Sequence, residues 1–125
     1  MSVFTDRELA FLQDGERRLA RIATVGSDGT PHVVPSGWRY NPDDDTIDLG
    51  GANLAATKKY RDVARTGRAA LVIDEVLPPW RPRGVEVRGR AEALDAGPLI
   101  RLHPERVVSW GIDTNGHERN ARSVG

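Results

Sequence analysis

The sequence of 125 residues contains no cysteine. This absence excludes disulfide bonds, thiolate metal sites, iron–sulfur clusters and a cysteine nucleophile. The sequence also has no apolar run of the roughly 18 residues that a membrane-spanning helix requires. The N-terminal segment lacks the basic and apolar regions of a signal peptide. We therefore expect a cytoplasmic protein without a membrane anchor.

An excess of charge of one sign is also absent, because 18 basic residues balance 18 acidic residues. A neutral total argues against long nucleic acid as a partner, since binding to a phosphate backbone usually requires a basic surface. The charges are unevenly distributed. Five basic residues accompany one acid over residues 57–68, and four arginines accompany one acid over residues 81–90. Such local basic patches fit a small anionic ligand.

Local patterns predict a mainly β chain with short helices. A capping box at Thr5 and Glu8 predicts a helix over residues 6–14, and a second helix is predicted over residues 53–65. Turn residues and period-two alternation predict strands over residues 19–25, 31–40, 46–51, 69–76, 84–93 and 106–112.

Six hairpin-linked strands with one inserted helix favour an antiparallel barrel over a βαβ sheet. The length suits one domain, which we expect at residues 1–113. A proline-rich loop is expected at residues 77–82 and a helical turn at residues 98–102. The polar residues 114–125 are expected to form a C-terminal tail with little intrinsic order.

The strongest candidate site is the tripeptide Thr57-Lys58-Lys59 near the start of the second helix. A helix N-terminus offers free backbone N–H groups and the positive end of the helix dipole. A hydroxyl and two ammonium groups at that position would complete a phosphate site. The alternative interpretation is a solvated helix face on which Lys58 pairs with Asp62 one turn later.

A second candidate site contains Arg81, Arg83, Arg88 and Arg90, with Trp80 next to the first of them. In a functional site, Trp80 would lie over a planar ring. The alternative is that arginines at alternate strand positions face water on one side of an antiparallel sheet.

Motifs for other chemistries are missing. His32, His103 and His117 show no metal-ligand spacing, so no metal site is predicted. Ser36 is not in a GxSxG elbow, and the sequence contains neither a Walker motif nor GxGxxG. No catalytic acid, base or nucleophile is therefore assigned. In such a protein a bound cofactor would supply the chemistry, and the chain would hold and orient it.

The segment NLAATKKYRDV at residues 53–63 resembles the phosphate motif of the pyridoxamine 5′-phosphate oxidase-like superfamily, a Ser/Thr followed by Arg/Lys and Lys at a helix start. Further segments resemble that superfamily in the same order, at residues 19–25, 28–32, 68–72, 85–91 and 101–110. The resemblance implies a six-stranded antiparallel split β-barrel, the FMN-binding split barrel. It also implies a homodimer with a cofactor groove at each end of the subunit interface.

Residues 80–84 (WRPRG) and 109–113 (SWGID) resemble the branch of this superfamily that uses the deazaflavin coenzyme F420. The resemblance implies that the cofactor phosphate is held by Thr57, Lys58 and Lys59. F420 carries a polyglutamate tail as well as a phosphate, and so requires more positive charge than FMN.

The resemblance also implies where the cofactor ring lies. The backbone of Val33, Val34 and Pro35 is expected to line the ring, with Trp38 nearby. Further cofactor contacts are expected from Arg61, Trp80, Arg81 and Arg83.

The function implied is an F420-dependent oxidoreductase that transfers a hydride between the deazaflavin and a small organic substrate with a conjugated double bond. Some members of the branch reduce such a bond in tetracycline precursors. The alternatives are an FMN-dependent oxidase and a non-catalytic protein that carries flavin or F420. The arginine-bearing C-terminal segment of true pyridoxamine phosphate oxidases has no match at residues 115–125, so synthesis of pyridoxal phosphate is not predicted.

Overall fold

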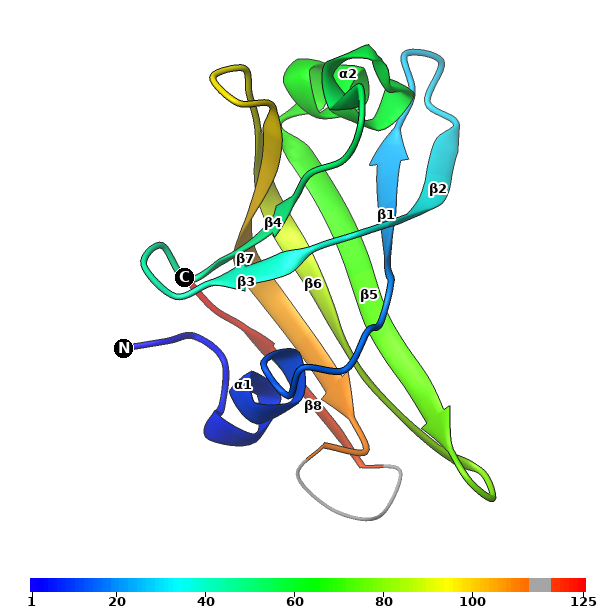
Figure 1. Ribbon diagram of the computed structural model, residues 1–125, viewed down its shortest axis with the longest axis vertical. Helices are drawn as coiled ribbons and strands as arrows, with labels where there is room; N and C mark the ends of the chain where they lie inside the picture. Colours follow the sequence, from blue (N-terminus) through cyan, green and yellow to red (C-terminus); the bar gives the residue numbers. More distant parts are fainter. Residues whose placement is uncertain (113–117) are drawn as a thin grey trace.

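The computed structural model describes residues 1–112 and 118–125 (Figure 1). The described residues form two α-helices, one short 3₁₀ helix and eight strands. In chain order the elements are α1 (Asp6–Leu12), β1 (Ala20–Val25), β2 (Pro31–Ser36), β3 (Arg39–Asn41), β4 (Thr46–Leu49), η1 (Leu54–Ala56), α2 (Lys58–Thr66), β5 (Arg68–Leu77), β6 (Arg81–Leu94), β7 (Leu99–Trp110) and β8 (Arg119–Ser123).

The strands form one curled antiparallel sheet in the order β2-β1-β5-β6-β7-β4-β3. β7 pairs with β6 along one edge, while its other edge pairs first with β4 and then with β8. β2 and β3 follow one another in the chain, yet these two strands are the ends of the sheet and do not pair. The barrel is therefore not closed, and it opens between β2 and β3.

Local sequence signals set the ends of the helices. Thr5 Oγ1 accepts a bond from the Glu8 N–H at 3.1 Å, and the Glu8 carboxylate accepts one from the Thr5 N–H at 2.9 Å. The predicted capping box is therefore confirmed. Gly67 ends α2 in the left-handed conformation, with φ of 69°, which glycine adopts without the steric cost that a Cβ would add.

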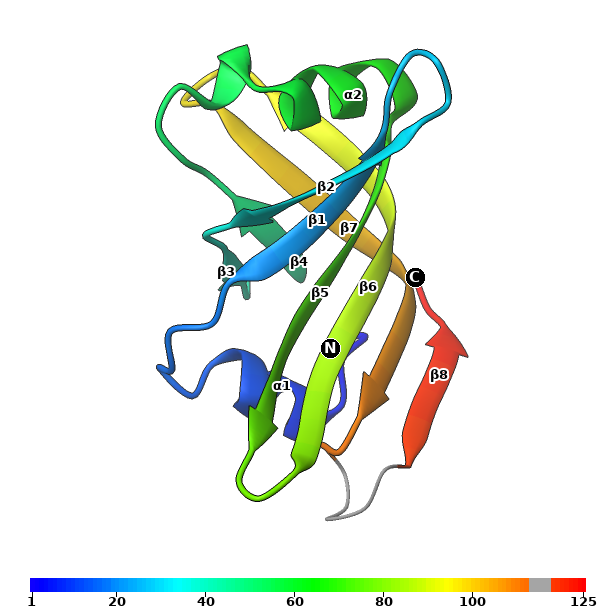
Figure 2. The same cartoon turned by 90° about the vertical axis from the view of Figure 1, so that its right-hand side faces the viewer.

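The core lies inside the curled sheet, and the two helices cover its opposite ends (Figure 2). α1 contributes Phe11 and Leu12 to this core, and α2 contributes Val63. Full burial of one such side chain contributes about 1.5–3 kcal/mol relative to exposure. The largest fully buried strand residues are Ile22, Ile47, Leu49, Leu71, Ile73, Val85, Val87, Ile100, Leu102 and Val107.

The sheet differs from the prediction in the number of its strands. Eight strands are present in the described chain where six were predicted. The predicted strand at residues 31–40 is divided at Gly37 and Trp38 into β2 and β3, because the chain crosses there from one edge strand of the open sheet to the other. Residues 98–102 do not form a helical turn. β7 already begins at Leu99, since β4 offers a free edge with which it pairs.

The C-terminal residues also differ from the prediction. Residues 119–123 form β8 on the second half of β7, so the expectation of a tail with little order is wrong for this part. Residues 113–117, with His117, lie outside the described residues. The expected loop at residues 77–82 is shorter than predicted, because β5 continues to Leu77 and β6 begins at Arg81.

Candidate functional site

Thr57 caps the start of α2. Its hydroxyl donates to the Leu54 carbonyl oxygen at 2.6 Å and accepts a bond from the Tyr60 N–H at 3.3 Å. The hydroxyl hydrogen is therefore already used inside the chain. The N–H groups of the first helical residues, Lys58 and Lys59, have no carbonyl oxygen within the helix to bond. These N–H groups are available to an anion.

The side chains of Lys58 and Lys59 extend from this helix start at accessible positions. Lys58 is 48% exposed, and its Nζ lies 3.7 Å from Asp62 Oδ1, so the ion pair of the alternative interpretation is present but loose. Lys59 is partly exposed, and no ion pair of Lys59 occurs within the described chain. Arg61 folds back and donates to the Ala56 carbonyl oxygen at 2.7 Å.

Asp62 attaches α2 to the sheet. Its side chain is buried, and its carboxylate accepts bonds from Thr24 Oγ1 at 2.8 Å and from Arg65 Nη1 at 3.3 Å. Burial alone would raise the pKa of Asp62. The bonds from Thr24 and Arg65, together with the charge of Lys58, nevertheless lower that pKa below its usual value. Asp62 therefore stays charged and orients Lys58.

The predicted ring-lining residues Val33, Val34 and Pro35 lie on β2, an edge strand at the opening of the barrel. Val33 is 66% exposed and Val34 is 41% exposed. One edge of β2 pairs with β1, and its other edge has no partner strand among the described residues. The N–H and C=O groups on this free edge can bond to a planar heterocycle.

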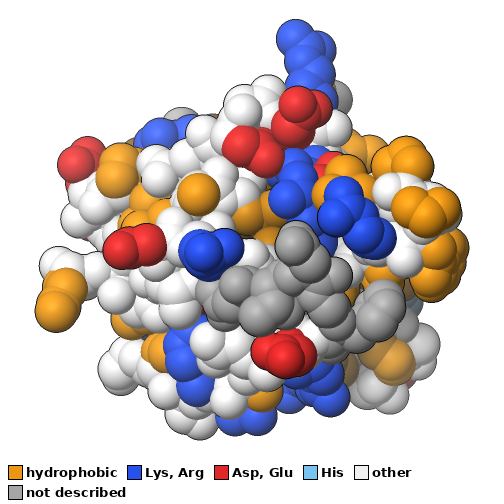
Figure 3. Space-filling model, turned by 90° about the horizontal axis from the view of Figure 1, so that it is seen from below, with side chains coloured by type: hydrophobic (Ala, Val, Ile, Leu, Met, Phe, Trp, Pro, Cys, Tyr) orange, Lys and Arg blue, Asp and Glu red, His pale blue; other side chains and the backbone are white. Residues whose placement is uncertain are grey.

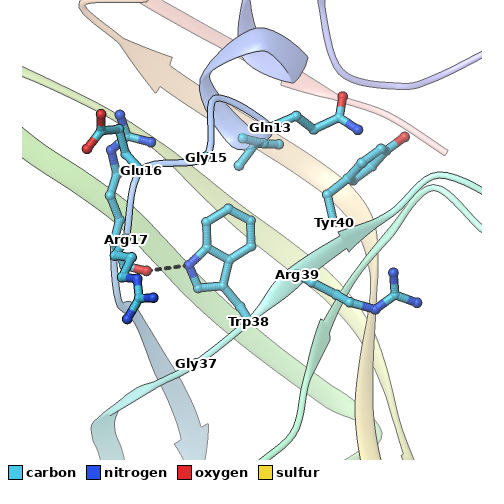
Figure 4. Close-up of a pocket in the computed structure, with 10 residues that line it drawn as sticks. Gln13, Gly15, Glu16, Arg17, Gly37, Trp38, Arg39 and Tyr40 are labelled. Atoms are coloured by element: carbon cyan, nitrogen blue, oxygen red, sulfur yellow. Dashed lines mark hydrogen bonds between the residues drawn. The ribbon is translucent and has the colours of Figure 1, made fainter.

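Trp38 projects from the junction of β2 and β3 into a cavity of about 450 Å³ (Figure 4). Its Nε1–H donates to the Arg18 carbonyl oxygen at 2.7 Å, which fixes the indole ring against the segment between α1 and β1. Tyr40 of β3 also lines this cavity, and its hydroxyl donates to Asp45 at 2.6 Å (Figure 4). A cavity of this volume suits a small organic molecule.

Trp80, Arg81 and Arg83 belong to the β5–β6 turn and the start of β6, at the end of the molecule opposite α2 (Figures 1 and 2). Trp80 is 69% exposed. Figure 3 shows apolar side chains gathered on the side where this turn lies, with Lys and Arg side chains beside them. Within one chain, the structure therefore does not bring these three residues to the start of α2.

Ion pairs occupy most of the arginine patch. Arg83 Nη2 lies 2.6 Å from Glu75, and its guanidinium lies 5.2 Å from the centre of the Phe11 ring. The other pairs join Arg88 to Glu86 at 2.9 Å and Arg90 to Glu92 at 3.3 Å. These contacts favour the interpretation of a water-facing sheet surface for Arg88 and Arg90, whereas Arg83 is partly buried against Phe11.

Sequence reasoning did not assign His32 and Gly26 to this site. His32 lies opposite Thr24 in the register of β1 and β2. A Cβ atom at Gly26 would lie 2.8 Å from His32 Nε2 and 3.3 Å from Lys58 Nζ, so the imidazole and the ammonium meet beside one backbone position. The hairpin turn predicts that residues 26 and 32 are neighbours, but the approach of Lys58 depends on how α2 packs. No sequence signal predicted that the segment between α1 and β1 lines the Trp38 cavity.

Residues 4–122 match the family model for pyridoxamine 5′-phosphate oxidase. The chain belongs to the pyridoxamine 5′-phosphate oxidase family. A 5a,11a-dehydrotetracycline/5a,11a-dehydrooxytetracycline reductase of Streptomyces rimosus subsp. rimosus is 35% identical to this family member, over 88% of the chain and 84% of its own length.

Two solved structures show the fold of this family member. A conserved hypothetical protein of Mycobacterium tuberculosis superposes with a TM-score of 0.72 at 21% identity, covering 99% of this chain and 94% of its own. An F420 reductase superposes with a TM-score of 0.60 at 19% identity, covering 78% of this chain and 94% of its own. The mainly β split barrel is thereby confirmed.

No helix in the described part of this family member is long and apolar enough to cross a membrane. Residues 1–112 and 118–125 also contain no group of three or more His, Cys, Asp or Glu side chains placed to hold a metal ion.

Proposed function

We propose that this protein is an F420-dependent reductase that transfers a hydride to a conjugated double bond of a small organic substrate. Membership of the pyridoxamine 5′-phosphate oxidase family supports an oxidoreductase with a flavin-type cofactor. The 35% identical reductase supports reduction of a small organic molecule. The observation on which the proposal depends is the start of α2, where Lys58 and Lys59 are accessible at the position of the family's phosphate motif.

The residues present fit a phosphorylated cofactor. The first turn of α2 carries two backbone N–H groups and the side chains of Lys58 and Lys59, and the nearby carboxylate of Asp62 is already bonded to Thr24 and Arg65. A hydrogen bond to a charged group contributes about 1.5–3 kcal/mol. The six residues of β2 run from the neighbourhood of Lys58 toward Trp38, a length of about 20 Å at about 3.3 Å per residue. This length accommodates a phosphate, a polyol chain and a tricyclic ring.

The elements of the chain then have separate roles. Lys58 and Lys59 hold the phosphate, the free edge of β2 holds the ring, and the cavity beside Trp38 receives the substrate. When bound, the reduced deazaflavin supplies a hydride to one carbon of the double bond, and a proton adds to the other carbon. Tyr40, the one phenol that lines the cavity in the described chain, already donates to Asp45, so water is the expected source of that proton.

A homodimer is part of this proposal. Trp80 and Arg81 lie at the far end of the chain from α2, so they reach a cofactor at α2 only from a second copy. Val76 beside them is 48% exposed. Val72, Val108 and Trp110 line a hollow of about 340 Å³ on the outer face of the sheet. Exposed apolar side chains such as Trp80 and Val76 mark protein interfaces.

One observation favours the alternative of a non-catalytic carrier of flavin or F420. Among the described residues that line the Trp38 cavity, the Tyr40 hydroxyl is already bonded to Asp45, and the Glu16 side chain is exposed to solvent, so neither is placed as a buried general acid. A carrier requires only the phosphate site and the ring edge. An FMN-dependent oxidase would use the same two features.

Fluorescence titration of the purified protein with F420 and with FMN tests the proposal. We expect saturable binding of F420 that is tighter than that of FMN, and oxidation of reduced F420 when a conjugated enone is added. FMN retained through purification would instead support the alternative. No saturable binding of either oxidised or reduced F420 would contradict the proposed function.

A further inference from the structure

We propose that His32 binds the cofactor phosphate together with Lys58, and that protonation of His32 strengthens this binding as the pH falls. The inference rests on the proposed function, because it concerns the same phosphate site. It adds a residue of β2 to a site that is otherwise built from α2, and it makes cofactor affinity dependent on pH.

Three elements meet where His32 and Lys58 lie. His32 is opposite Thr24 in the register of β1 and β2, so the two side chains share one face of the sheet. Thr24 donates to Asp62 of α2 at 2.8 Å, which places α2 against that face. A Cβ atom at Gly26 would be 2.8 Å from His32 Nε2 and 3.3 Å from Lys58 Nζ. Both nitrogen atoms therefore lie close enough together to contact one small anion.

The lack of a side chain at Gly26 allows this approach. Gly26 is buried, and its φ lies outside the left-handed region, so the backbone conformation there does not require glycine. A methyl group at this position would contact the imidazole at a distance that real Cβ atoms essentially never show. The position is therefore one where space for His32 and Lys58 favours glycine.

The charged groups of α2 leave His32 without a carboxylate partner. Asp62 is bonded to Thr24 and Arg65 and faces Lys58, so its oxygens are already used. Arg65 also donates to the carbonyl oxygen of Val25 at the end of β1. The charged groups of α2 near His32 are therefore the carboxylate of Asp62, which is already paired, and the cations of Lys58 and Arg65.

The turn between β1 and β2 contributes Asp28. Its carboxylate accepts the Thr30 N–H at 2.9 Å. This bond, with a smaller contribution from the charge of His32, holds the pKa of Asp28 below its usual value. No ion pair between His32 and a carboxylate forms in the part of the chain that the structure describes. A protonated His32 would repel the nearby ammonium group of Lys58. An anion bound between the two cations would offset this repulsion, so phosphate binding and protonation of His32 favour each other.

Binding measurements at two pH values test this inference without any turnover. Two ligands are compared. The first is F420 without its glutamate tail, and the second is the dephosphorylated deazariboflavin core of F420. The readout is the Kd from fluorescence titration at about pH 6 and about pH 8, the range in which an ordinary imidazole titrates. The phosphodiester keeps its charge over this range, so the ligand does not contribute a titration of its own. The variants are His32→Gln and, as a matched control, His103→Gln, whose imidazole instead lies 2.7 Å from Glu92.

We expect the phosphorylated ligand to bind the wild-type protein and the His103→Gln variant about tenfold more tightly at the lower pH, as one charge-assisted hydrogen bond allows. The His32→Gln variant should lose this difference, and the dephosphorylated core should show none with any variant. If His32→Gln leaves the affinity and its pH dependence unchanged, or weakens both ligands equally, the inference is wrong while the proposed function stands. If neither ligand binds the wild type, both are wrong.

Gly26→Ala is a second variant that does not change the charge of the site. The added methyl group should displace His32 from Lys58 and weaken binding of the phosphorylated ligand several-fold, with little effect on the dephosphorylated core. Circular dichroism of each variant checks that the fold is kept. Wild-type affinity for the phosphorylated ligand in a folded Gly26→Ala protein would contradict the proposed geometry.

Discussion

Glu8 Oε1 lies 2.6 Å from Arg122 Nη2, and this ion pair joins residues 114 positions apart in the chain. Glu8 is fully buried in α1, where it also completes the capping box with Thr5 and accepts a bond from Ser109 at 2.6 Å. The pair therefore connects the first helix to the last strand, β8, and holds both chain ends against β7.

We expect Arg122→Leu to destabilise the protein by about 3–5 kcal/mol, because it leaves the charge of Glu8 buried without its partner. Urea denaturation measures this change. Arg88→Leu is the matched control. It removes an arginine from the half-exposed pair with Glu86, where solvent screening should keep the loss of stability small. Equal stability losses in the two variants would show that the Glu8 pair has no special role.

The same pair predicts how stability depends on pH. Burial would raise the pKa of Glu8, but the bonds from Arg122, Ser109 and the Thr5 N–H lower it below the usual 4.5. Because the folded-state pKa is the lower one, Glu8 stabilises the fold above about pH 4.5, and this contribution is lost as the pH falls further. Melting temperatures between about pH 6 and pH 3 should therefore fall more steeply in the wild type than in Glu8→Gln. Parallel curves would contradict this assignment.

Lys58→Ala and Lys59→Ala should each weaken F420 binding roughly tenfold to hundredfold, since each removes about 1.5–3 kcal/mol of charged hydrogen bonding. The fold should remain, because Asp62 keeps its bonds to Thr24 and Arg65. Titration of F420 fluorescence measures the affinity. Arg90→Ala removes an exposed cation that pairs with Glu92, and it should leave the affinity unchanged. Unchanged affinity in both lysine variants would place the phosphate elsewhere.

Trp80→Ala should weaken the proposed homodimer while leaving the melting temperature of the monomer nearly unchanged, because the indole is 69% exposed and contributes little to the core of its own chain. Sedimentation velocity at several protein concentrations measures the dimer. Leu19→Ala, which truncates another exposed apolar side chain at 50% exposure, is the control. A wild-type protein that stays monomeric at all concentrations would rule out the dimer.

Several features of the fold depend on residues that are close in sequence, and these were predicted. The capping box at Thr5 and the hairpin turn between β1 and β2 both act through bonds between neighbouring residues. The tripeptide Thr57-Lys58-Lys59 likewise falls at a helix start because the Thr57 hydroxyl accepts the N–H of Tyr60.

Other features depend on pairing between distant segments, and these were missed. β7 begins at Leu99 because β4 lies beside it, and β8 forms because the second half of β7 has a free edge. Neither residues 99–105 nor β8 has a strong local strand pattern, since strand formation depends on the partner that a segment meets. The separation of Trp80 from α2 has the same cause, because β5 and β6 together span the length of the molecule.

By itself the sequence determined a mainly β chain with two short helices, the first of them begun by a capping box, and a basic start of the second helix. Short-range hydrogen bonds and side-chain chemistry are sufficient to specify these features. Only the tertiary structure decided that the barrel is open between β2 and β3, and that His32 meets Lys58 beside Gly26. Those contacts join residues from different elements, and their positions follow from how the sheet curls and where α2 packs, which no local pattern encodes.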